Sequence, residues 1–248
     1  MIFVLSGEGP TDLGKNILGK DGIEFVPGPV TYFVDGLYRE KYQYSLLESN
    51  PEQFCLISES DLSRFAKSEK GQNRRNILIP GIKNHHLKPH GFMARALGWK
   101  AEKIKEDTGE ECVIPVFFRD TDSNDEKDYQ EKLISIDTGF AAAGFPNRGV
   151  AILAKPKSEA WLLCLADHYQ NGHLYENGPA NDASPNSLKS QLAKKINPDG
   201  ENPLLSAEQL CSYVKGIEQI DFDRMCEQLS SFAQFVHRFQ KAINAEQD

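Results

Sequence analysis

The 248-residue chain has few cysteines and no long apolar run, and these shortages exclude several classes of protein. Its five cysteines are odd in number and include no C-x-x-C pair, which favours buried thiols in a reducing compartment over a disulfide framework or a zinc knuckle. The apolar start MIFVL is too short for a signal peptide and lacks the basic flank, and the later run AWLLCLA is too short to span a bilayer. We therefore expect a cytoplasmic protein with no membrane partner.

Two further absences concern chemistry and architecture. No serine lies in a G-x-S-x-G elbow, so acyl-transfer catalysis has no support, and no internal repeat is present. The sequence does contain 40% hydrophobic residues, enough for the core of one large domain or of one domain with an appendage.

The charge is unevenly distributed along the chain. The net charge of -8 argues against a generic nucleic-acid coat, yet residues 62–105 contain eleven Lys and Arg against two Glu. A local positive field can hold a polyanion in an acidic protein, and the alternative is a solvated charged surface. We treat residues 60–106 as a basic elaboration of the fold.

Short apolar segments alternate with helical spacing. The predicted strands are IFVLS at 2–6, QFCLISES at 53–60, CVIPVFFRD at 112–120 and VAILA at 150–154. Helical patterns cover residues 27–42, 60–70, 88–107 and 126–144, and a further helix begins near Glu159. This alternation predicts an α/β fold with a mostly parallel central sheet flanked by helices.

The composition changes after residue 168. Residues 1–168 form the predicted catalytic domain, and 169–248 form a linker and a helical C-terminal extension. The last predicted helix, at 221–243, spaces its apolar residues three and four apart. This stripe packs on its own domain or, as the alternative, forms a homo-oligomer through the C-terminal helix.

The first glycine turn resembles a nucleotide-binding loop. GPTDLGKN at 9–16 nearly matches G-x-x-x-x-G-K-[ST], but Asn16 replaces the hydroxyl that would hold magnesium and Pro10 has no amide to donate. Glu8 and Asp12 would also repel phosphate oxygens. The turn therefore favours a cation over a nucleotide.

Acidic residues follow two of the predicted strands. Glu8 and Asp12 follow the first, and Asp120 and Asp122 follow the strand at 112–120. If these strands are neighbours, the carboxylates meet at one sheet edge, where two like charges about 4 Å apart cost roughly 4 kcal/mol at an effective dielectric of 20. Hard oxygen ligands suit Mg²⁺ or Mn²⁺ and not zinc. The structural alternative for Asp120 and Asp122 is an Asx turn or a helix cap.

These motifs resemble a known family. A glutamate after the first strand and an Asp-x-Asp after a later one are similar to the Toprim domain of topoisomerases, primases and overcoming-lysogenization-defect (OLD) nucleases. GEGPTD resembles the nuclease branch, in which a second acid lies four residues after the glutamate, here Asp12. PKSEAWLL and GPVTYFVDGLY resemble small stand-alone prokaryotic Toprim-like proteins of unassigned function.

The resemblance implies a Toprim-like, Rossmann-like sheet and a Mg²⁺- or Mn²⁺-dependent endonuclease with one or two ions. The implied metal ligands are Glu8, Asp12, Asp120, Asp122 and Glu159. The implied catalytic residues are Glu8, Asp120, Asp122 and Lys157, with Lys155 as an alternative to Lys157. Glu159 has an equal structural explanation, because a helix dipole favours an acid in the first turn.

The partners are implied in the same way. The distance between Glu8 and Asp120 leaves room for an insertion that clamps nucleic acid, DNA rather than RNA, through Arg74, Arg75, Lys83, His86 and Lys88. His85, His86 and His90 are not accompanied by the Cys or acid that a zinc site needs. OLD nucleases carry a fused ATPase, so a separate ABC/AAA-type ATPase and a role in antiphage defence are implied.

Two other functions remain open. In a haloacid-dehalogenase-like phosphatase Asp120 would be the nucleophile and Asp122 the acid, but this leaves Glu8 unexplained. A non-catalytic regulatory or scaffold subunit would retain the fold and bind an ATPase through its C-terminal helix.

Overall fold

A four-stranded, all-parallel sheet forms the centre of the computed structural model, which describes residues 1–9, 11–19, 22–72, 89–200, 204–217 and 219–245. The strand order is β4-β1-β5-β6. The strands are β1 (Ile2–Gly7), β4 (Phe54–Leu56), β5 (Val113–Asp120) and β6 (Val150–Ala154). All four predicted strands are present, and the predicted α/β fold with a parallel sheet is confirmed.

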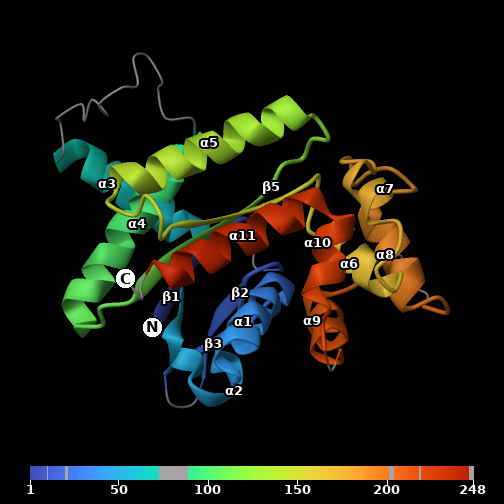
Figure 1. Ribbon diagram of the computed structural model, residues 1–248, viewed down its shortest axis with the longest axis horizontal. Helices are drawn as coiled ribbons and strands as arrows, with labels where there is room; N and C mark the ends of the chain where they lie inside the picture. Colours follow the sequence, from blue (N-terminus) through green and yellow to red (C-terminus); the bar gives the residue numbers. More distant parts are fainter. Residues whose placement is uncertain (10, 20–21, 73–88, 201–203, 218, 246–248) are drawn as a thin grey trace.

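Helices connect the strands and cover both faces of the sheet (Figure 1). The helices that precede β6 are α1 (Pro29–Tyr42), α2 (Leu46–Ser49), α3 (Glu59–Gln72), α4 (Pro89–Thr108) and α5 (Glu126–Ala142), with a 3₁₀ turn at Pro51–Gln53. Side chains alternate along β1, so that Phe3 and Leu5 face α1 while Val4 faces the α3–α5 layer. Burial on both faces explains why these strands are continuous apolar runs.

The C-terminal helices pack on the same face of the sheet as α1. After β6 come α6 (Glu159–Ala166), α7 (Gly172–Glu176), α8 (Leu188–Ile196), α9 (Ala207–Lys215), α10 (Phe222–Gln228) and α11 (Ser230–Asn244). The buried ring of Trp161 on α6 stacks on Phe235 of α11, with centroids 5.9 Å apart. The C-terminal helices thus share one core with β1 and α1, so the change in composition after residue 168 is not a break in packing.

The last predicted helix differs from the structure in two ways. It is broken at Leu229, whose extended backbone separates α10 from α11. Its apolar stripe, which includes Phe232, Phe235 and Phe239, is buried in the protein's own core. Of the two expected uses of this stripe, packing on its own domain is the one that the structure shows.

An antiparallel hairpin, formed by β2 (Gly14–Leu18) and β3 (Ile23–Pro27), was not expected from the sequence. Most of its side chains are exposed, including the apolar Ile17, Leu18 and Ile23, so its residues do not alternate between a buried and an exposed face as a predicted strand would. Lys15 and Asn16 lie on β2, whereas a phosphate-binding loop leads into a helix. The hairpin therefore removes the nucleotide-loop alternative. Within the ranges described above, no helix combines the length and apolarity needed to cross a membrane.

Candidate functional site

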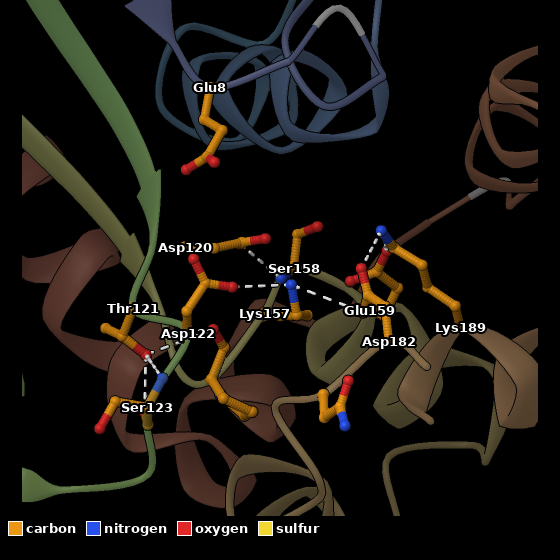
Figure 2. A network of polar contacts seen from close by, with 12 residues as sticks. Glu8, Asp120, Thr121, Asp122, Ser123, Lys157, Ser158, Glu159, Asp182 and Lys189 are labelled. Carbon is orange, nitrogen blue, oxygen red and sulfur yellow. Dashed lines mark hydrogen bonds and ion pairs between the residues drawn. The ribbon is translucent and has the colours of Figure 1, made fainter. Parts of the chain in front are cut away.

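The predicted acids lie together at the carboxyl end of the sheet because the strands that carry them are neighbours. β5 lies between β1 and β6, with Gly7 beside Phe118 and Asp120 beside Ala154. Asp120 ends β5, Asp12 lies in the turn that follows β1, and Glu159 begins the helix that follows β6. Figure 2 shows the carboxylates of Asp120 and Glu159 on either side of Ser158.

Ser158 connects two of these acids. Its backbone N–H donates to Asp120 Oδ1 at 2.9 Å, and its hydroxyl donates to Asp12 Oδ1 at 2.5 Å. The serine is buried at the start of α6, so the β6–α6 turn fixes both hydrogen bonds. The sequence motifs did not indicate this role for Ser158.

Burial and mutual repulsion raise the pKa values of the three acids. The pKa of Asp120 lies well above its usual range because the carboxyl is buried and because Asp12 and Glu159 carry like charge nearby. Burial also raises the pKa of Asp12, against the hydrogen bond from Ser158. Burial and the charge of Asp12 raise the pKa of Glu159 to about 7. A bound cation would offset the cost of their negative charges.

One oxygen of this group is unsatisfied. The Glu159 side chain is 10% exposed, and its Oε2 has no hydrogen-bond partner among the residues that the structure describes. A buried carboxylate oxygen without a donor is costly, and a bound cation is one way to satisfy it. We name Asp12, Asp120 and Glu159 the buried acid group.

Glu8 lies beside this group but already has a cation. Arg119, on β5, forms an ion pair with Glu8 at 3.0 Å and a second one with Glu59 of α3. The Glu8 side chain is 45% exposed, and its charge contributes only the last of the effects that raise the pKa of Asp12. The arginine directly precedes Asp120 in the sequence, but no motif indicated that it would pair with Glu8.

Asp122 points to a lysine. Its backbone has φ of 51°, in the left-handed region, and its carboxylate accepts from Lys157 Nζ at 2.7 Å. Burial alone would lower the pKa of Lys157, but this bond and the charge of Asp122 raise it above its usual range. Asp122 and Lys157, both predicted as catalytic, therefore neutralise each other in this conformation.

Two residues from the C-terminal region reach the same site. Asp182 lies 2.7 Å from Lys189 Nζ and 3.5 Å from Lys157 Nζ, and Lys189 Nζ lies 3.9 Å from Glu159 Oε1 (Figure 2). Asp182 belongs to the polar segment interpreted as a linker, and Lys189 is on α8. No local pattern distinguishes them, because only the packing of α8 on α6 brings them to Glu159.

The other predicted residues have different places. Lys155 pairs with Glu126 at 2.7 Å, and Asp125 caps α5 by accepting from the backbone of Asp128. The predicted nucleic-acid contacts lie outside the described residues: Arg74, Arg75, Lys83, His86 and Lys88, together with His85. His90, on α4, is near Arg119 and Lys132, and burial followed by these charges lowers its pKa.

The donor set fits a hard divalent cation by its chemistry. It consists of carboxylate oxygens, it suffers internal repulsion, and it includes the unsatisfied Oε2 of Glu159. In the part of the chain that the structure describes, no three His, Cys, Asp or Glu side chains are already gathered around one ion position. Binding an ion would therefore require the acids to exchange present hydrogen bonds and ion pairs for metal contacts.

Comparison with known proteins adds no relative to this arrangement. No protein-family model, no curated protein and no solved structure matches the chain. The similarity to Toprim nucleases therefore rests on the short motifs around Glu8, Asp12, Asp120 and Asp122, and the site is interpreted from its own chemistry.

Proposed function

We propose that this protein is a divalent-metal-dependent nuclease of the Toprim type that hydrolyses phosphodiester bonds in DNA. The observation that carries the proposal is the buried acid group, in which burial and then neighbouring carboxylates raise the pKa values of Asp120 and Glu159 and in which Glu159 retains an unpaired oxygen. Such a group is stabilised by Mg²⁺ or Mn²⁺, whose preferred ligands are oxygens.

Each acid has a role in holding the ion. Asp12, Asp120 and Glu159 would hold it from the buried side, and Glu8 and Asp122 would add to them by exchanging Arg119 and Lys157 for the ion. A bound divalent ion supplies an activated water and neutralises charge on the phosphate. Once Asp122 has moved, the ammonium of Lys157 is free to approach the phosphodiester oxygens and offset their negative charge.

The finer parts of the proposal follow from the resemblance alone. A cytoplasmic nuclease of this type acts with a separate ABC/AAA-type ATPase in antiphage defence. DNA is the substrate, and the basic elaboration at residues 60–106 holds it. The two alternative functions are a phosphatase and a non-catalytic scaffold, and the experiment distinguishes both from a nuclease.

The test is nicking of supercoiled plasmid by the purified full chain. We expect nicking in Mg²⁺ or Mn²⁺, none in EDTA, and none with Asp120→Asn. Asp107→Asn is the matched control, because Asp107 is an exposed residue of α4 outside the site. Hydrolysis of p-nitrophenyl phosphate with intact plasmid would favour the phosphatase, and absence of Mn²⁺ binding by calorimetry would favour the scaffold.

A further inference from the structure

A lysine of the C-terminal region stands where the buried acid group faces α8. Lys189 Nζ lies 3.9 Å from Glu159 Oε1. Among the described residues, Lys189 is thus the cation that pairs with Glu159, one of the implied metal ligands.

The position of this ammonium group is fixed by its surroundings. Asp182 accepts from Lys189 Nζ at 2.7 Å, and the other oxygen of Asp182 lies 3.5 Å from Lys157. Helix α8 is itself anchored, since Leu188 and Leu192 are buried and the Ser187 hydroxyl caps its first turn. Asp182 and the anchored helix α8 therefore both hold Lys189 beside Glu159.

We propose that Lys189 takes the place of a second metal ion, so that the site binds one divalent ion beside a resident ammonium group. The inference rests on the proposed function, because only a metal centre has ion positions to fill. It specifies the stoichiometry of that centre as one ion, held by Asp12, Asp120 and the unpaired Oε2 of Glu159, with Lys189 beside Oε1 of Glu159, instead of two ions.

Charge repulsion explains why a second divalent ion cannot share Oε1 of Glu159 with Lys189. A second ion at that oxygen would stand next to the ammonium, and repulsion between charges of +1 and +2 is twice that between two unit charges at the same distance. Each oxygen of Glu159 then has its own cation, the ammonium at Oε1 and the single ion at Oε2. Asp182 is then a positioning residue, because it acts through Lys189.

The test counts Mn²⁺ ions by calorimetry and by electron paramagnetic resonance of free Mn²⁺. We expect one ion in the wild type and a second ion in Lys189→Met, bound at least tenfold more tightly than any second ion in the wild type. Lys194→Met removes the same charge from an exposed position of the same helix and leaves the count at one. Lys189→Arg retains the cation and also leaves it at one.

The double variant Lys189→Met/Glu159→Gln makes the test specific. It should return to one ion, because the second ion needs the carboxylate that Lys189 had occupied. Two ions in the wild type, or one ion in folded Lys189→Met, would overturn the inference and leave the nuclease proposal intact. No Mn²⁺ bound by the wild type or by any variant would overturn the proposed function itself.

Discussion

The acids at this sheet edge fall into two sets that differ in how they are satisfied. Glu8, after β1, is 45% exposed and paired with Arg119, whereas Glu159, after β6, is 10% exposed and has an oxygen without a partner. The motif glutamate is therefore stable without an ion. The need for a cation arises in the buried acid group, which the motif alone would not have ranked first.

The difference follows from where the protein's own cations can reach. Arg119 extends from β5 and contacts Glu8 and Glu59 directly. Lys157 is engaged by Asp122 at 2.7 Å, and Lys189 approaches Glu159 no closer than 3.9 Å. Asp12 accepts from Ser158 and Thr11, Asp120 accepts from Ser158, and these hydrogen bonds lower the two pKa values less than burial raises them.

The largest expected effect is on metal binding. Asp120→Asn should weaken Mn²⁺ binding at least 100-fold, about 2.7 kcal/mol, and should increase thermal stability in EDTA. The two effects have opposite signs because the amide removes an ion ligand and also removes buried charge, while its oxygen still accepts from Ser158. Calorimetry and thermal unfolding measure them. A loss of both stability and binding would mean that Asp120 is a structural residue only.

An effect of similar size is the pH dependence of stability that Glu159 contributes. A raised carboxyl pKa means that the folded state binds the proton more tightly, so this stability is present below pH 4.5 and lost as pH rises through about 7. At about 1.4 kcal/mol per pKa unit, the loss in EDTA is roughly 3 kcal/mol. Urea unfolding of the wild type and Glu159→Gln should show their stabilities diverging across this interval.

The matched control is Glu102→Gln, an exposed change on α4 that should follow the wild type at every pH. A difference between wild type and Glu159→Gln that stays flat from pH 4.5 to 7.5 would contradict the raised pKa. Adding Mn²⁺ should restore the stability of the wild type at high pH. It should not change the stability of Asp120→Asn, because this variant binds the ion weakly.

A smaller effect compares two hydroxyl groups that donate to the Asp12 carboxylate, that of the buried Ser158 and that of the exposed Thr11. Ser158→Ala removes the 2.5 Å bond to Asp12 and should lower the free energy of unfolding at pH 7 by about 1–2 kcal/mol. Thr11→Val removes a 3.2 Å bond to the same carboxylate at an exposed position, and should cost less than about 0.5 kcal/mol. Equal losses in the two variants, measured by urea unfolding, would show that the buried hydrogen bond contributes no more to the free energy of unfolding than the exposed one.

Much of the fold could be predicted because burial leaves a local signal. Strands covered on both faces are apolar runs, and the alternation with helices made a parallel sheet the expected arrangement. That arrangement brings Asp12 and Asp120 to one edge, where the structure has them. The hairpin of β2 and β3 left no such signal, since most of its side chains are exposed.

The rest of the site depends on tertiary contacts that no local pattern encodes. Ser158 is one of many serines before a helix, and its two acceptors come from distant parts of the chain. Asp182 lies in a polar segment whose composition indicated a linker, and Lys189 lies on α8, just after that segment. Motifs therefore located the acids but not the groups that neutralise them.

A small effect on stability is expected for Glu8→Gln, and it completes the comparison. Exposed ion pairs contribute little, so the variant should lose less than about 1 kcal/mol in urea unfolding at pH 7 in EDTA. Arg119 would retain Glu59 as a partner. The same carboxyl-to-amide change at Glu159 should instead stabilise the protein, because it removes a buried charge. If Glu8→Gln stabilised the protein as much as Glu159→Gln, the two acids would belong to a single repelling cluster, and Arg119 would not be an effective counter-ion for Glu8.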